Sequence, residues 1–194
     1  MDIVFIRHGK SMLNGSGCYI GSTDCDMGEE GYRQAEKAKE LIKDASFDVV
    51  LTSPLKRAIQ TAQVIGRDYM KDLRLCEMDF GIFEGLRYQD AVKKYPEYME
   101  KWNADYLNYK IPGGESLNDV YDRVEDFINS LRGVYEKVLV ITHGGVIRCA
   151  LSLMLSNRDH FYRFRVDHGS ISIASFDGDY SFIKAVNILS NINF

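Results

Sequence analysis

The hydrophobic residues of this chain gather first in short runs that are typical of buried strands. The run at residues 3–6 is apolar throughout and stops at Arg7, and the runs at 48–52 and 138–142 have the same character. Continuous apolar runs of this length are typical of strands that are covered on both faces. The three runs therefore predict a mainly parallel central sheet.

Between these runs, apolar residues recur at helical spacing. Segments 29–43, 55–68 and 117–131 each place such residues along one face. The last segment has the clearest pattern, and Ser116 and Asp119 precede it with the spacing of an acidic capping box. We expect these helices to pack on the sheet.

The remaining segments complete the predicted architecture. Residues 170–176 alternate, Asp177-Gly178 forms a turn signal and 180–186 returns, which predicts a closing antiparallel hairpin. Strands that alternate with helices indicate an α/β fold, here a three-layer sandwich with helices on both faces of the sheet. The insertion at about 75–115 is aromatic and aperiodic. It predicts a small cap of short helices and loops over the carboxyl edge of the sheet, where ligands of such folds bind.

Length and composition narrow the class of protein. The 194 residues suit a single domain, 1–194, and the net charge of -4 gives no reason to expect a nucleic-acid partner. No run approaches the roughly 18 apolar residues of a membrane span, and the first residues do not have the pattern of a signal peptide, so we expect a cytoplasmic protein. The four cysteines are scattered, without the spacing of a zinc or redox site.

Two histidines point to chemistry at the predicted carboxyl edge. His8 and His143 each begin a His-Gly pair directly after a buried run, and Arg7 precedes the first. A single histidine in such a place is more often a structural residue than a catalytic one. The matched positions of the pair instead favour a shared site.

Arg57 and Glu77 are further candidates. Arg57 falls in the first turn of the helix after the second strand, where a guanidinium and the helix start could grip a phosphate; the alternative is a solvated arginine. Glu77 follows apolar residues, where burial would favour its protonated form and let it act as an acid. Asp79 and Glu84 compete with it for this role.

Taken together, these motifs resemble the histidine phosphatase (phosphoglycerate mutase-like) superfamily. They occur in that family's order and span most of the chain. They are Arg7-His8-Gly9, Ser53-x-Leu55-x-Arg57-Ala58-x-Gln60-Thr61-Ala62, Glu77-x-x-Phe80-Gly81-x-Phe83-Glu84-Gly85 and Thr142-His143-Gly144.

The resemblance implies a mechanism without metal or cofactor. In it His8 attacks phosphorus to give a phosphohistidine, while Arg7, Arg57 and His143 hold the phosphoryl oxygens. Glu77 would protonate the leaving oxygen and then activate water. The resemblance further implies phosphate contacts from Asn14 and from backbone amides near Gly21 and at Gly144.

Departures from the mutases favour hydrolysis over phosphoryl exchange. Residues 78–80 differ from the mutase sequence after the acid, and Gly145 replaces an asparagine. Segments 19–24, 95–102 and 112–116 resemble the α-ribazole-5′-phosphate phosphatases of cobalamin nucleotide-loop assembly. Aromatic residues of the cap could stack on such a substrate, although most would simply pack: Phe80, Phe83, Tyr88, Tyr98, Trp102, Tyr106 and Tyr109.

Several alternatives stay open. We expect the protein to act on a small phosphomonoester, and it could instead be a broad-specificity phosphatase, a sugar-phosphate phosphatase or a mutase. A different class of function is a protein of this family that binds a phospholigand or phosphoprotein and has only weak catalytic activity. The sequence also leaves a homodimer open. His160 and His168 are expected in a surface loop and a turn, without a catalytic role.

Overall fold

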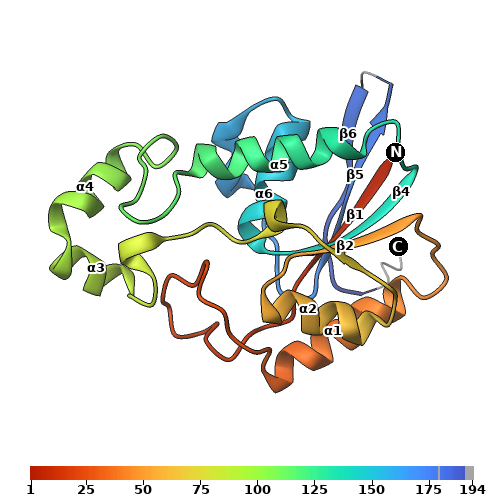
Figure 1. Cartoon of the computed structure of the whole chain (residues 1–194), viewed down its shortest axis with the longest axis horizontal. Helices are drawn as coiled ribbons and strands as arrows, with labels where there is room; N and C mark the ends of the chain where they lie inside the picture. Colours follow the sequence, from red (N-terminus) through yellow and green to blue (C-terminus); the bar gives the residue numbers. More distant parts are fainter. Residues whose placement is uncertain (179, 191–194) are drawn as a thin grey trace.

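A single mixed sheet organises the chain. The computed structural model describes residues 1–178 and 180–190, and in this part six strands pair in the order β3-β2-β4-β1-β5-β6 (Figure 1). The first four in that order run parallel and the last two antiparallel to their neighbours. The strands are β1 (Asp2–Arg7), β2 (Val49–Thr52), β3 (Met70–Lys71), β4 (Lys137–Thr142), β5 (Ile171–Asp177) and β6 (Tyr180–Ile188).

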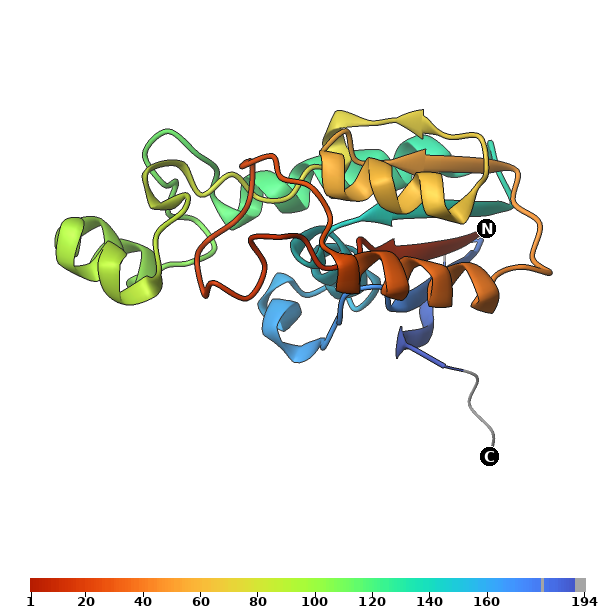
Figure 2. The ribbon, with the colours of Figure 1, turned by 90° about the horizontal axis from the view of Figure 1, so that it is seen from below.

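Helices cover both faces of this sheet. α1 (Glu29–Leu41) and α2 (Lys56–Ile65) pack on one face, and α5 (Leu117–Leu131) and α6 (Gly144–Met154) on the other, as Figures 1 and 2 show. Alternate residues of the apolar run in β1 enter the two cores: Ile3 and Phe5 on the α5/α6 side, Val4 and Ile6 on the α1/α2 side. The predicted three-layer α/β sandwich is confirmed.

The helix boundaries follow local chemistry. α5 begins and ends where its pattern predicts, and Ser116 and Asp119 form the reciprocal capping box. α2 is shorter than the predicted 55–68, because Gly66 takes the left-handed conformation (φ 76°) that ends it. α1 also ends earlier, at Leu41. The two-residue β3 was not predicted, since both of its side chains are exposed and leave no pattern.

The cap projects beyond the carboxyl edge of the sheet, at the left in Figure 1. It contains α3 (Tyr88–Lys94), α4 (Pro96–Ala104) and the short 3-10 turn η2 (Gly81–Phe83). Phe83, Met99 and Ile111 are almost fully buried and join the cap to the α5/α6 core. The predicted cap of short helices and loops is therefore confirmed.

Two further 3-10 turns are η1 (Leu73–Leu75) and η3 (Arg158–Arg163). No helix in the described part of the chain is long and apolar enough to cross a membrane.

Candidate active site

The register of two parallel strands brings the two His-Gly pairs together. Arg7 of β1 lies opposite Thr142 of β4, so His8 and His143 leave the sheet side by side. Their ring centroids are 4.9 Å apart with the planes at 60°, and both residues are buried. The structure therefore places the two imidazoles next to each other, as the sequence predicts.

The His8 ring is oriented for nucleophilic attack. Its Nδ1 lies 2.8 Å from the Gly9 carbonyl oxygen, which can only accept, so Nδ1 carries the proton and Nε2 keeps its lone pair. Burial lowers the pKa of His8 well below its ordinary value, and the charges of Arg57 and Arg7 lower it further. The imidazole is therefore neutral at neutral pH, which is the state that a nucleophile needs.

His143 has the complementary arrangement. Its Nε2 lies 2.7 Å from Ser53 Oγ, which also accepts from the Leu55 N–H, and we assign the Ser53 hydroxyl as the donor to Nε2. On that assignment Nδ1 carries the proton of His143, and this atom is buried without a hydrogen-bond partner in the described residues. Burial, followed by the proximity of His8, lowers the pKa of His143 well below its ordinary value. His143 thus offers a neutral N–H donor beside His8.

Arg7 lies against the start of α6. Its Nη1 donates to the Val166 carbonyl oxygen at 2.6 Å, and a Cβ added at Gly144 would be 3.2 Å from its Cζ. Burial lowers the pKa of Arg7 to about 10, an effect that the charge of Glu77 opposes, so the guanidinium remains charged at neutral pH. Arg7 and the helix N-terminus at Gly144 consequently present positive charge to the same place.

Arg57 is buried, with only 1% of its surface exposed. This excludes the solvent-exposed arginine that the sequence left open as an alternative. It lies in the first turn of α2, where Nη2 donates to the Gly21 carbonyl oxygen at 2.7 Å and Nη1 to that of Thr23 at 2.8 Å. The loop of residues 21–23 thus holds the guanidinium in place, Nη1 also contacts Cys25 Sγ at 4.0 Å, and Nε and the second N–H of Nη2 remain for an anion.

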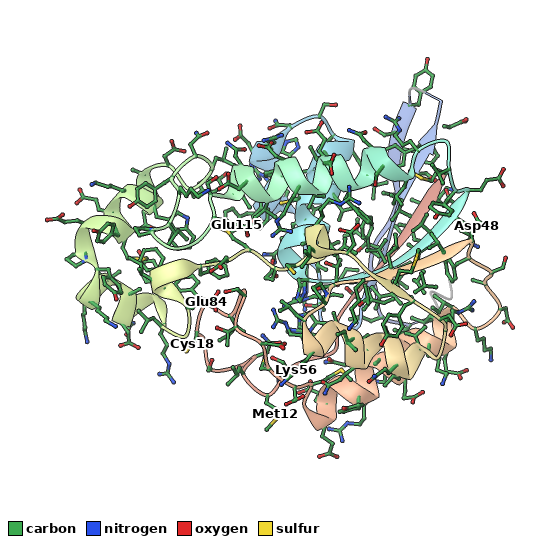
Figure 3. The ribbon with its side chains drawn as sticks, viewed as in Figure 1. Met12, Cys18, Asp48, Lys56, Glu84 and Glu115 are labelled. Carbon is green, nitrogen blue, oxygen red and sulfur yellow. The ribbon has the colours of Figure 1, made fainter. Side chains whose placement is uncertain are left out.

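Glu84 holds the same loop from the opposite side. Its carboxylate accepts from the backbone N–H groups of Gly21 and Ser22, each at 3.0 Å, and of Thr23 at 3.3 Å and Phe80 at 3.1 Å. Figure 3 labels Glu84 at the cap, near Cys18 of the long loop after β1. Its two oxygens are thus committed to backbone donors, so Glu84 is not placed to give a proton to a substrate.

In this arrangement the amide of Gly21 itself is not free for phosphate, and the predicted contact near Gly21 stays a prediction. The Gly21 amide donates to Glu84 and does not face an open site; Gly21 contributes its carbonyl oxygen, to Arg57, instead. A Cβ at Gly21 would lie 1.8 Å from the Met78 carbonyl oxygen, so the residue type is required by packing. Asn14 lies in the loop after β1 and its Oδ1 accepts from the Ser11 N–H at 3.0 Å. Its contact with phosphate stays a prediction.

Glu77 is the carboxylate that faces the site. Its Oε2 accepts from the Gly145 N–H at 3.1 Å and its Oε1 from the Met78 N–H at 3.0 Å, and it is half-buried where the sequence predicted burial. A side chain at position 145 would require the Glu77 carboxylate to move, since a Cβ there would be 2.2 Å from Oε1. Asp79 instead accepts from the Gly81 N–H at 2.8 Å. Geometry therefore favours Glu77 over both competing carboxylates.

A cavity of about 200 Å³ opens beside Glu77, under the cap. Of the cap aromatics named from the sequence, three line it, whereas Phe83 is buried and Tyr88 and Tyr98 are exposed. Tyr19, Phe161 and Tyr162, which come from distant segments, line it as well and were missed. The full lining is Tyr19, Glu77, Met78, Phe80, Trp102, Tyr106, Leu117, Val120, Gly145, Arg148, Phe161 and Tyr162.

Two further residues near the site were not recognised from the sequence. Arg148 of α6 lines the cavity, and His168 lies with its ring centroid 5.4 Å from that of His8. Helical spacing from Gly144 could have indicated Arg148, because residues four positions apart on a helix share a face. His168 also begins a His-Gly pair, but no buried apolar run precedes it, and its turn reaches His8 only through the pairing of β1 with β5.

This fold and this arrangement define an α/β protein with a neutral, buried imidazole among arginines at the carboxyl edge of its sheet. The comparisons with known proteins agree with that class. A family model described as histidine phosphatase superfamily (branch 1) matches residues 3–189. The chain therefore belongs to the histidine phosphatase superfamily, and it is a phosphatase.

The relatives and solved structures that are similar to this chain are named for different substrates. Phosphoserine phosphatase 1 of Hydrogenobacter thermophilus is 29% identical over 99% of this chain and 94% of its own length. The crystal structure of a putative α-ribazole-5′-P phosphatase from Escherichia coli aligns with a TM-score of 0.92 at 28% identity, covering 100% of this chain and 99% of that one. The α-ribazole phosphatase of Shigella flexneri aligns with a TM-score of 0.91, also at 28% identity, over the whole of both chains.

Proposed function

We propose that this phosphatase hydrolyses a small phosphomonoester through a phosphohistidine at His8, and that the leaving group carries a flat aromatic ring, as in α-ribazole 5′-phosphate. The observation that carries the proposal is the aromatic cavity beside Glu77. Glu77 lines this cavity and its charge also acts on Arg7 beside His8, a position that suits an acid between phosphate and leaving group.

In the first half-reaction, Nε2 of His8 attacks phosphorus. The N–P bond forms with the nitrogen lone pair, the bond between phosphorus and the ester oxygen breaks, and protonated Glu77 gives its proton to that oxygen. The His8 ring gains positive charge, which its Nδ1–H shares with the Gly9 carbonyl oxygen. Arg7, Arg57 and the His143 Nδ1–H face the developing charge on the phosphoryl oxygens.

In the second half-reaction, water replaces the alcohol. Glu77, now a carboxylate, takes a proton from the water, the water oxygen attacks phosphorus, and the N–P bond breaks with its electron pair returning to His8. Phosphate leaves and Glu77 is protonated again. The arginines supply the positive charge that a metal ion supplies elsewhere, so the proposal requires no metal.

The lining of the cavity supports an aromatic leaving group. Tyr19, Phe80 and Trp102 lie within 6.2 Å of one another by ring centroids, and Trp102 Nε1 is buried without a partner in the described residues. A flat ring with one hydrogen-bond acceptor would satisfy both features. The two solved structures named as α-ribazole phosphatases support the same substrate and, with it, a place in cobalamin assembly.

A second candidate substrate is suggested by Arg148. Its Nε donates to the Phe164 carbonyl oxygen at 3.1 Å, and no carboxylate of the described residues forms an ion pair with its side chain. A substrate carboxylate could occupy that place, as in phosphoserine, which is the substrate named for the Hydrogenobacter relative. The apolar cavity favours the aromatic candidate, because a serine side chain would leave it empty.

The test is a comparison of kcat/KM values with chelator present. The substrates are α-ribazole 5′-phosphate, phosphoserine, 3-phosphoglycerate, fructose 2,6-bisphosphate and a phosphotyrosine peptide. We expect α-ribazole 5′-phosphate to exceed the others, and Trp102→Ala to remove that preference, with Tyr98→Ala, an exposed position on the same helix, as control. A preference for phosphoserine that Arg148→Ala abolishes would establish the second candidate instead.

A further inference from the structure

His168 is a buried imidazole beside the nucleophile that the proposed mechanism does not use. Its ring meets the His8 ring edge-on, with centroids 5.4 Å apart and planes at 63°. His8 is therefore flanked by two imidazoles, His143 and His168. Among the described residues no other ring lies this close to His8.

The turn that carries His168 is fixed to the active site. The Gly169 N–H donates to the Arg7 carbonyl oxygen at 3.0 Å, and the Arg7 N–H donates to that of Ser170 at 3.1 Å. Gly169 itself packs against Gln34 of α1, where a Cβ would lie 2.8 Å from Gln34 Cβ. The position of His168 relative to His8 is thus set by backbone contacts on both sides, and not by a mobile loop tip.

The orientation of the His168 ring leaves one nitrogen without a partner. One side of the residue lines a surface hollow with Lys10, Gln34 and Lys37, yet Nε2 is buried and has no hydrogen-bond partner in the described residues. This nitrogen is therefore not exposed to solvent in the hollow. A buried polar atom without a partner is costly and calls for an explanation.

Two other buried nitrogens share this property at the same site. They are Arg7 Nε and His143 Nδ1. All three belong to residues that surround His8, so one ligand with several acceptor oxygens would satisfy them together.

We propose that His168 is a further ligand of the phosphoryl group. Its Nε2–H donates to an oxygen of that group, first in the bound substrate and then in the phosphohistidine at His8. The inference rests on the proposed function and adds a contact to it. Burial, followed by the charges of Arg7 and Lys10, lowers the pKa of His168 to about 3. The ring is accordingly neutral at working pH, with one N–H to donate and no charge that would compete with Arg7.

The experiment measures orthovanadate binding and kcat/KM for wild type, His168→Phe, His168→Gln and His160→Phe. Phenylalanine keeps a ring against His8 and removes the donor, whereas the glutamine amide can still donate. His160→Phe is the matched control, since His160 also has a buried unpartnered nitrogen but lies in η3. We expect His168→Phe to weaken vanadate binding and kcat/KM about tenfold or more, with KM changing less than kcat, His168→Gln to retain part of both, and the control to match wild type.

The outcomes separate this inference from the proposed function. Equal vanadate affinity in wild type and His168→Phe would overturn the role of His168 and leave the phosphatase mechanism intact. Wild type that neither binds vanadate nor hydrolyses phosphomonoesters would overturn both. Should His168→Phe fail to fold, histidine ¹⁵N NMR of the wild type decides: the His168 Nε2–H signal must shift on adding orthovanadate, and an unchanged signal refutes the proposal.

Discussion

At the scale of single residues, the reactivity of the site comes from burial combined with positive charge. His8 is buried next to Arg7 and Arg57, and both effects disfavour its protonated form. The Gly9 carbonyl oxygen then decides which nitrogen keeps the proton. A neutral ring with a free Nε2 follows from the fold, before any substrate is present.

We predict that His8 does not titrate near neutral pH in the folded protein. Its pKa is lowered, so the ring should stay neutral as the pH falls through 6.5, the ordinary midpoint of histidine. Ring ¹H–¹³C NMR between pH 8 and pH 5.5, with His8→Asn to assign the signal, measures this directly. A midpoint between pH 6 and 7 would contradict the electrostatic account.

The role of Glu77 predicts a dependence on the leaving group. Glu77→Gln removes the proton that an alkoxide needs, while p-nitrophenolate leaves without one. We expect kcat/KM to fall about 10²–10⁴-fold with an alkyl phosphate and much less with p-nitrophenyl phosphate. Asp79→Asn, at the competing carboxylate, is the control and should affect both substrates alike. Equal losses in Glu77→Gln would assign the acid to another group.

At the scale of elements, the loop of residues 21–23 connects the cap to the sheet. Its carbonyl oxygens accept from Arg57 at the start of α2, and its amides donate to Glu84 beside η2. The loop thus transmits the position of the cap to a guanidinium of the active site. Glu84 acts on the chemistry through Arg57 and is a positioning residue.

Glu84→Ala should therefore impair both stability and activity. Removing the carboxylate leaves four backbone N–H groups without their acceptor, and we expect the free energy of unfolding to fall by about 2–4 kcal/mol. We also expect kcat/KM to fall at least tenfold, because Arg57 loses its support. Urea unfolding and steady-state kinetics measure the two effects, with the exposed Glu100→Ala as control. Wild-type kinetics in a folded Glu84→Ala would show that the loop does not position Arg57.

The elements that sequence predicts best are those whose signals are local. The capping box and the apolar stripe of α5 lie within the helix itself, so its bounds are found without error. The end of α2 depends on the conformation of Gly66, and β3 on its pairing with β2, which local patterns do not show. The errors in the predicted secondary structure therefore lie at helix ends and in an edge strand.

At the scale of the whole molecule, the site combines residues that the sequence could name and contacts that it could not. His8, His143, Arg57 and Glu77 follow from motifs next to predicted strands and helices. His168 becomes part of the site only because β5 pairs with β1 across more than 150 residues. The hydrogen bond from the Gly21 amide to Glu84 is another long-range contact that the sequence does not show.

The buried histidines also predict how stability depends on pH. His8 and His143 have lowered pKa values when folded and ordinary values near 6.5 when unfolded, so below pH 6.5 the unfolded chain binds more protons. Their contribution is complete above about pH 6.5 and is lost as the pH falls, at about 1.4 kcal/mol per histidine and pH unit. Urea unfolding between pH 7.5 and pH 5 measures the slope. A flat profile, or the same slope in His8→Asn/His143→Asn, would contradict it.

The central claim is that a phosphoryl group passes through His8, and trapping that intermediate tests it most directly. Glu77→Gln is mixed with p-nitrophenyl phosphate, because the first half-reaction then needs no acid while the second lacks its base. The reaction is quenched in alkali, where a phosphoramidate survives, and the peptides are analysed by mass spectrometry. We predict one phosphoryl group per chain, on His8, absent from His8→Asn. Nitrophenolate release without a phosphorylated His8, or with the label on His143, would contradict the mechanism.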